Sequence, residues 1–565
     1  MLQIITDKFF SSEHIHNTER KVIVYSNMDI NGIVATKIGT LEPIDKFSTT
    51  PTYLFTYNNR MENNGPGPVA IGDAQIIDDF LAMCSFWFQG IFSTDKNLIK
   101  YLTRDKKENS INEQHLPKDI IPLIFTKRRI FNKLKNEQFS DFFNAVINLK
   151  RSTYKQIIKT IRQYRDALLT INSNLELSYT MFVASVESLS GQFSDYTSNW
   201  NDVDKVLKES LDEILATLEP EIANDIKNRI IENSHLKIAR RYTEFSISNI
   251  SDSFFLEDAR GIKYPCRKSQ ISSAIKNSYQ IRSKYVHSLK ELPNIFSLSG
   301  DLEVFKEGKD LYFTLAGLSR FIREVIISFI YKQEPVISEK IDYSGEIPNT
   351  ISLPMSPSLW INNAQNYNVK NSKEYFNALL VELVPSLTLG KPLIDLTEVC
   401  DAIIKLIKGV SKEQKVPMSA FYIIYNMFLK EEYRHSNSEN FLEEYTETTD
   451  ILATENIILH LLFNFDFPWN TTDIYDSYKR YDEKRFQKNQ IVLPQIIETC
   501  LLIELANCYL NEGNEIMYKE IILKAVYEHP GNKQLIMHYR NIESNIKQKL
   551  MIDWKNDILF TNSPS

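Results

Sequence analysis

The chain has 565 residues, 43% of them hydrophobic and 12% aromatic, which is enough for several buried cores and for two to four domains. Its formal net charge of −7 excludes a protein that coats nucleic acid over its whole surface, although a local basic site remains compatible with it. The five cysteines are far apart and form no CxxC pair, which excludes a disulfide framework and a zinc cluster.

Membrane and export signals are also missing from the text of the chain. The first residues, MLQIITDKFF, show no basic stretch followed by an apolar run and a cleavage site. No window approaches the roughly 18 uninterrupted apolar residues of a membrane helix. We therefore expect a cytoplasmic protein with no membrane partner.

Residues 1–145 contain short β-type runs, KVIVYS, PTYLFTY and VAIGDA, followed by the more helical text FLAMCSFWFQGIF. These runs predict an N-terminal α/β or β-rich domain. His14 and His16 alternate as ligands on a strand would, but no third ligand lies near them, so we expect no metal site there.

Residues 146–335 are mainly helical in pattern. Apolar residues recur at three- and four-residue spacing, as a helix burying one face requires: Leu177, Phe182, Val183, Val186 and Leu189. The stretch DLEVFKEGKDLYFTL predicts a β-hairpin, and LAGLSRFIREVIISFIY predicts an apolar helix after it. We expect a central helical domain here.

Residues 336–565 begin with the linker-like text PNTISLPMSPSLW and continue as amphipathic helices. Within residues 500–545, Tyr509, Ala525 and Pro530 have the spacing of a tetratricopeptide repeat, although Tyr518 stands where that repeat has a small residue. One unit is found where about three make an independent array. We expect a helical C-terminal domain with a repeat-like end.

A basic segment lies in the middle of the chain. Gly261 to Lys290 hold seven Lys or Arg residues and no Asp or Glu. Residues 271–292, ISSAIKNSYQIRSKYVHSLKEL, taken as a helix, have an apolar stripe that consists of Ile271, Ile275, Tyr279, Val286 and Leu289. Arg282 falls on the same stripe, and a buried guanidinium needs a partner, for which Glu187 is our prediction. His287 lies roughly 140° around the helix from Arg282 and about 7.5 Å along it.

The text around this segment resembles a known family. VASVESLS (184–190 with its flanking Val183), about a hundred residues before YQIRSKYVHS (279–288), and the closing apolar helix together resemble an HEPN domain of the ApeA-like group. The resemblance covers residues 146–335. The motif of an Arg followed by four to six residues and a His also occurs at Arg229 and His235, but order and spacing favour Arg282 and His287.

The resemblance implies an all-helical domain that forms a homodimer, bringing two motifs into one cleft that cuts RNA without a metal or other cofactor. It implies that Arg282, His287 and Glu187 are catalytic, with Glu187 at the acidic position of the family's motif. RNA contacts would come from Lys284, Ser283, Lys276, Lys290 and Tyr279. Ser283 departs from the Asn, Asp or His that many members carry, and it can hydrogen-bond but not carry charge.

The same resemblance implies a role in bacterial defence against phage, in which RNA of translation, such as tRNA, is cut. By position, residues 1–145 would then be a sensor or regulatory domain, and a phage-derived trigger or a protein partner would act on the N- or C-terminal domain.

Two other functions are compatible with the sequence. In a non-catalytic module, the central helices only dimerise, Arg282 only pairs with Glu187, and the C-terminal helices bind a partner protein. A helical-repeat scaffold would need at least two further repeats in residues 336–500, and the text shows none.

Overall fold

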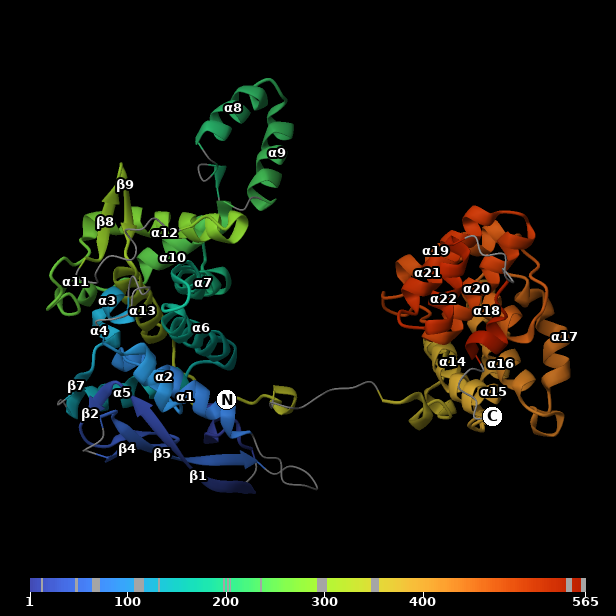
Figure 1. Cartoon of the computed structure of the whole chain (residues 1–565), viewed down its shortest axis with the longest axis horizontal. Coiled ribbons are helices and arrows are strands. Elements are labelled where there is room, and N and C mark those ends of the chain that lie inside the picture. Colours follow the sequence, from blue (N-terminus) through green and yellow to red (C-terminus); the bar gives the residue numbers. More distant parts are fainter. Residues whose placement is uncertain are drawn as a thin grey trace. The chain divides into compact units, whose positions relative to one another are not determined.

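The computed structural model describes residues 1–11, 14–45, 49–62, 72–105, 116–130, 133–196, 199–200, 203, 205–233, 236–291, 302–346, 355–544 and 551–559. The chain divides into two compact units, Met1–Ile351 and Ser352–Ser565. Each unit has its own hydrophobic core. The protein is mostly helical, and every strand of the described residues belongs to the first unit (Figure 1).

The main sheet of the first unit has five strands in the order β3-β4-β5-β1-β6. Its long strands β1 and β5 pair in antiparallel register, from Ile15 opposite Glu62 to Tyr25 opposite Thr52. Strands β2 and β7 form a short parallel pair, and β8 and β9 form a hairpin. The strands are β1 (Ile15–Ser26), β2 (Met28–Ile30), β3 (Val34–Thr36), β4 (Gly39–Asp45), β5 (Thr52–Glu62), β6 (Phe92–Ser93), β7 (Arg128–Ile130), β8 (Val304–Glu307) and β9 (Asp310–Phe313).

Three of the predicted strand signals are confirmed. KVIVYS lies in β1 and PTYLFTY lies in β5, where Phe55 stacks on Phe80 of helix α1 with ring centroids 3.8 Å apart. The predicted hairpin is formed by β8 and β9, and Gly308 adopts the positive φ that its turn requires. VAIGDA is different, because Val69 to Ile71 lie outside the described residues and Asp73 begins α1.

Helix α7 is at the centre of the helical part of the first unit, in contact with α6, α10, α12 and α13. As expected, its apolar spacing buries Phe182, Val183, Val186 and Leu189, whereas Leu177 in its first turn is exposed. Helices α8 and α9 extend away from this bundle (Figure 1). The helices are α1 (Asp73–Phe88), α2 (Lys96–Leu102), α3 (Pro117–Ile120), α4 (Pro122–Phe125), α5 (Lys133–Ile147), α6 (Arg151–Thr170), α7 (Leu175–Phe193), α8 (Lys205–Leu215), α9 (Pro220–Asn233), α10 (Leu236–Ser248), α11 (Ser253–Leu256), α12 (Lys268–Ser288) and α13 (Leu315–Tyr331).

The expected boundary near residue 145 does not separate two bodies. It falls inside α5, whose side chains Phe142 and Val146 are fully buried in a core shared by the sheet and the central helices. Gln3 Nε2 also donates to the backbone oxygens of Ile147 and Leu149, each at 2.8 Å. The sheet region and the central helices therefore form one compact unit, because neither part buries its apolar faces alone.

The second boundary lies further along the chain than residue 336. Val336 N donates to Asn148 O at 2.6 Å, and Glu339 N donates to Lys8 O at 3.1 Å. These bonds tie residues 336–339 to the first unit, so the second unit begins at Ser352.

The second unit is helical throughout its described residues, as the sequence predicts. Its repeat-like end is a pair of packed helices, α20 and α21, joined at Gly513, which has a positive φ. The helices are α14 (Ser372–Leu389), α15 (Thr397–Ile407), α16 (Lys412–Phe428), α17 (Ser438–Thr449), α18 (Thr454–Phe463), α19 (Thr471–Lys484), α20 (Gln495–Asn511), α21 (Glu515–Glu528) and α22 (Lys533–Glu543), followed by a π-helical turn, η9 (Lys555–Leu559).

Within the described part of the chain, no helix combines the length and the apolar character needed to cross a lipid bilayer.

Candidate functional site

The first half of α12 anchors this helix in the first unit. The side chain of Gln270 accepts from Arg267 N at 3.0 Å and so closes the first turn. Asn277 Nδ2 donates to Leu311 O at 2.8 Å, which ties α12 to strand β9. Ile271 and Ile275 are buried in the core. Because α12 is one continuous helix, the anchored first half sets the axis and the rotation of the second half, and so determines which way its side chains point.

The second half of α12 is more open than the predicted apolar stripe requires. Val286 is 47% exposed and Leu289 is 73% exposed, so only Ile271, Ile275 and part of Tyr279 are covered. Leu289 ends the helix in the left-handed region with φ 50°, and its N–H donates to Tyr285 O at 2.8 Å. The stripe prediction is therefore wrong for its last turn.

Glu187 and Arg282 meet as expected. Glu187 of α7 lies 2.8 Å from Arg282 of α12, between Oε2 and Nη2, with the side chains 13% and 22% exposed. Among the described residues, neither Glu187 Oε2 nor Arg282 Nε has an aligned hydrogen-bond partner. The contact is thus an ion pair with unused hydrogen-bonding capacity on both sides.

Two tyrosines flank the ion pair. The Arg282 guanidinium lies 5.9 Å from the ring centroid of Tyr279, whose ring is 5.7 Å from that of Tyr242. Tyr242 is buried, and its hydroxyl lies 3.1 Å from Ser278 Oγ. Burial raises the pKa of Tyr279, and the Glu187 carboxylate raises that pKa further. Sequence reasoning missed Tyr242, because an aromatic residue at helical spacing is no signal of a site.

Burial raises the pKa of the Glu187 carboxyl above its ordinary value, and the charge of Arg282 partly opposes this. The folded protein therefore holds a proton on Glu187 more tightly than the unfolded chain does. It follows that this group's contribution to stability falls as the pH rises from the ordinary carboxyl pKa through the raised one.

We expect Arg282→Ala to lower the free energy of unfolding of the first unit by about 1–3 kcal/mol at pH 8, because it leaves a half-buried carboxylate without its cation. The loss should be smaller at pH 5 than at pH 8, because burial raises the pKa of Glu187, Arg282 no longer lowers it, and a larger fraction of the carboxyl is protonated at the lower pH. Urea unfolding of both proteins at the two pH values measures the difference. Adding Glu187→Gln to both proteins should remove the pH dependence, and an equal loss at both pH values would contradict this account.

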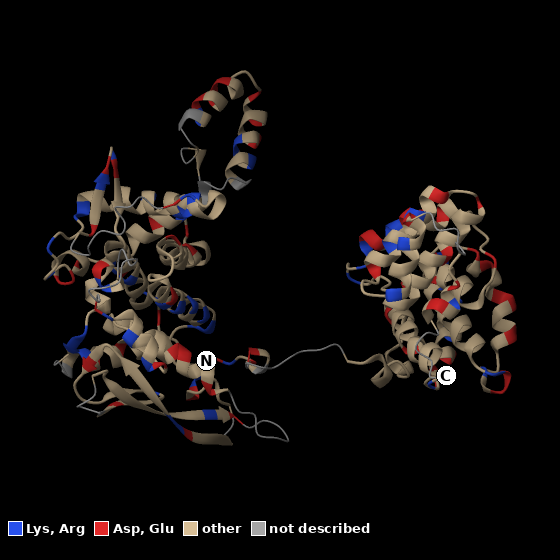
Figure 2. Cartoon of the chain, viewed as in Figure 1, with Lys and Arg blue, Asp and Glu red and all other residues tan. Residues whose placement is uncertain are grey.

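The other predicted residues lie on or just beyond α12 and are not gathered around the ion pair. Ser283 is half-buried. The remaining basic side chains of the prediction are exposed: Lys276, Lys284, His287 and Lys290. Figure 2 shows Lys and Arg positions on α12 in blue. Because His287 lies roughly 140° around the helix from Arg282, one chain does not bring the two side chains to one point.

The second Arg and His match of the sequence lies elsewhere. Arg229 of α9 is exposed and pairs with Asp225 at 2.9 Å on the same helix face. His235 lies outside the described residues. Arg229 has the environment of an ordinary solvated helix, unlike Arg282.

Comparisons of the chain with protein-family models, with curated proteins and with solved structures find no match.

Proposed function

We propose that the chain is a metal-independent endoribonuclease of the HEPN type, with Arg282 and His287 as its catalytic residues. The observation that carries this proposal is the position of Arg282. It is held against Glu187 and Tyr279 on a helix whose open half carries His287 and lysines. A guanidinium held in place and an exposed imidazole on the same helix are suitable groups for cutting a phosphodiester, once a second copy of the helix brings them together.

RNA supplies its own nucleophile in this chemistry. The 2′-oxygen forms a bond to phosphorus, the bond from phosphorus to the 5′-oxygen breaks, and a 2′,3′-cyclic phosphate remains. His287 takes the proton of the 2′-hydroxyl, and the 5′-oxygen leaves as a hydroxyl after it takes a proton from water. Arg282 donates to the phosphate oxygens as their charge develops, for which its fork of N–H groups is suited.

The other predicted residues have supporting roles in this proposal. Lys276, Lys284 and Lys290 attract the RNA backbone through charge. Ser283 hydrogen-bonds to the phosphate, and Tyr279 stacks on a splayed base. Glu187 holds Arg282 in place, so it acts as a positioning residue.

A homodimer completes the site in this proposal. A single chain leaves His287 and Arg282 on different sides of α12, while Val286 and Leu289 expose apolar surface at the end of the same helix. If two copies of the chain pair across this surface, they cover Val286 and Leu289. The pairing also brings the Arg282 and His287 motifs of both copies into one cleft. A strictly monomeric protein that retains activity would contradict this part.

We further propose that the enzyme is a cytoplasmic effector of bacterial defence that cuts tRNA or another RNA of translation after a phage-derived trigger. This rests on the family resemblance of residues 146–335. The shared core of the sheet and the helical bundle supports a regulatory role for the sheet region, since a signal there reaches the bundle through packed side chains.

A second candidate is a non-catalytic dimerisation and protein-binding scaffold. The ion pair between Arg282 and Glu187 favours this candidate, because an arginine with a purely structural role would form the same pair. Under this candidate, cellular activity survives Arg282→Ala combined with His287→Ala and is lost when the chain is cut after residue 351, which removes the second unit.

The proposal is tested by induced expression in bacteria of the wild type, His287→Ala and the matched control His16→Ala, which also removes an exposed imidazole. We expect wild type and control to arrest growth and to create discrete new RNA 5′ ends, both abolished by His287→Ala. Identical behaviour of all three proteins, with and without phage infection, would contradict the nuclease.

A further inference from the structure

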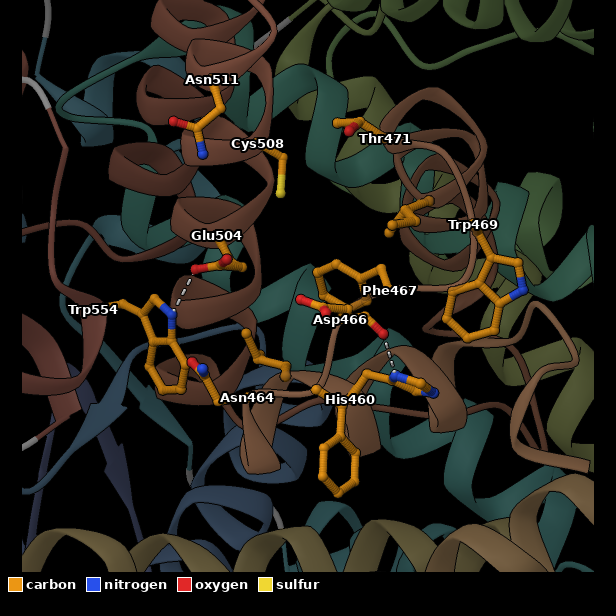
Figure 3. A pocket seen from close by; sticks show the side chains of 13 residues that line it. His460, Asn464, Asp466, Phe467, Trp469, Thr471, Glu504, Cys508, Asn511 and Trp554 are labelled. Carbon is orange, nitrogen blue, oxygen red and sulfur yellow. Dashed lines mark hydrogen bonds between the residues drawn. The ribbon is translucent and has the colours of Figure 1, made fainter. Parts of the chain in front are cut away.

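The second unit contains a cavity of about 360 Å³ that the proposed nuclease does not use. It lies where the end of α18, the loop after it, the start of α19, the end of α20 and Trp554 meet (Figure 3). Aromatic and acidic side chains line it together with one histidine, among them His460, Asp466, Phe467, Trp469, Glu504 and Trp554.

The charged groups of this cavity are acidic. Asp466 and Glu504 line it, and neither forms an ion pair with any described residue. No Lys or Arg is among the described residues that line it. Trp554 Nε1 donates to Glu504 Oε2 at 2.8 Å and so holds this carboxylate in a fixed orientation (Figure 3). Lys555 lies 5.2 Å from the Trp554 ring, measured from Nζ to the ring centroid, but it is not among the described lining residues. The described lining of the cavity therefore has a negative formal charge.

His460 adds a further acceptor. Its side chain is only 8% exposed, and its Nδ1 lies 3.0 Å from the backbone oxygen of Asp466. A carbonyl oxygen only accepts, so Nδ1 carries the hydrogen, and Nε2 of the neutral ring is left with a free lone pair. Nε2 is buried and has no hydrogen-bond partner within the described residues. Such a buried acceptor calls for a donor.

Aromatic rings surround the same space. The Trp469 ring is T-shaped to the His460 ring, with centroids 5.3 Å apart. The ring centroids of Phe465 and Phe467 lie 6.0 Å and 6.2 Å from that of His460. The indole N–H of Trp469 is already used, since it donates to Asp450 O at 2.8 Å. Aromatic faces attract cations through their quadrupole, most strongly when the cation is desolvated.

We propose that this cavity binds a small organic cation, an ammonium or guanidinium group on a short apolar chain. The unused acceptors of Asp466, Glu504 and His460 match a group that has only donors, and the rings match its positive charge and its methylenes. A phosphate or carboxylate ligand would be repelled by the two carboxylates. The same chemistry is offered by a free diamine and by the arginine side chain of a partner protein.

The test uses the full chain and two matched pairs of probes. Binding of each probe is measured by calorimetry and by the change in tryptophan fluorescence. Putrescine is compared with 1,4-butanediol, which has the same length without charge. A capped Gly-Arg-Gly peptide is compared with its citrulline counterpart. We expect the charged member of at least one pair to bind saturably and at least about tenfold more tightly than its neutral partner. Preference for putrescine indicates a free amine, and preference for the peptide indicates a partner's side chain.

Glu504→Gln assigns the binding to this cavity, because the amide still accepts from the Trp554 indole while the charge is lost. We expect about tenfold weaker binding of the preferred cation. Glu443→Gln, which removes an exposed carboxylate on α17, should leave the affinity unchanged and so controls for attraction to the acidic protein as a whole. Equal binding of charged and neutral probes, no saturable binding of either cation, or an affinity unaffected by Glu504→Gln would each overturn the proposal.

Discussion

Arg320→Met is expected to lower the free energy of unfolding of the first unit by about 3–5 kcal/mol, because it leaves a carboxylate buried without its cation. Arg320 of α13 and Glu303 are 5% and 4% exposed. Two parallel hydrogen bonds of 2.6 Å join them, from Nε to Oε1 and from Nη2 to Oε2. Methionine fills the volume of the side chain, so the loss reports the charge rather than a large cavity.

The same pair connects several segments. Arg320 Nη1 donates to Phe254 O at 2.8 Å, and the guanidinium lies 3.7 Å from the Phe254 ring centroid. Glu303 Oε2 also accepts from Cys266 N at 2.8 Å, two residues before α12 begins. Loss of the pair therefore loosens the segment that leads into the proposed catalytic helix.

The measurement is urea unfolding of Arg320→Met beside Arg260→Met, which replaces an exposed arginine of the same unit and should change stability little. Adding Glu303→Gln to Arg320→Met should recover part of the loss, because the unpaired charge is then gone while the acceptor for Cys266 N remains. A loss below about 1 kcal/mol, or no recovery in the double variant, would contradict a buried charge as the cause.

In the purified protein, His287→Ala is expected to slow RNA cleavage by about 10²–10⁴-fold, the range that a general acid or base contributes. The His287 imidazole is exposed on the last turn of α12. Because its removal uncovers no buried core, the variant should unfold at the same urea concentration as the wild type. Activity and stability are thereby separated in one variant.

Cleavage is measured on total bacterial RNA with protein purified from uninfected and from phage-infected cells, and the products are tested for 2′,3′-cyclic phosphate ends. His16→Ala is the control and should cleave at the wild-type rate. Arg282→Lys should also be slow, because an ammonium keeps the charge beside Glu187 but loses the fork of donors. A rate within about threefold of wild type for His287→Ala would show that His287 is not a catalytic residue.

Local periodicity predicted several elements well. The bounds of α13 agree with the predicted apolar helix LAGLSRFIREVIISFIY, and the spacing of Phe182, Val183, Val186 and Leu189 identified the buried face of α7. These predictions succeed because neighbours one turn apart lie on one face of a helix, whatever the rest of the chain does.

Periodicity failed where burial depends on a distant element. Val286 continues the stripe of α12 but is exposed, since the elements that cover Ile271 and Ile275 do not extend over it within the described residues. Likewise, the sheet region and the central helices looked like two domains, but α5 buries its aromatic side chains in a core common to both.

In the site, too, some features could be predicted from the sequence and others depended on distant segments. That Arg282 needed an acidic partner followed from the cost of burying an unpaired charge, and Glu187 was the partner predicted. Tyr242, the Arg320 and Glu303 pair and the cavity around His460 left no local pattern, because their members come from segments far apart in the chain.

By itself, the sequence predicted a mostly helical chain with a strand-rich beginning, a helix at 271–292 that overlaps a basic segment, and an arginine on that helix that needs an acidic partner. These properties depend on spacing and on the chemistry of single residues. Only the tertiary structure decided where the compact units divide, which side chains of α12 are open and which acceptors surround the cavity of the second unit. Those properties depend on distances between segments that the chain brings together only when its apolar faces pack.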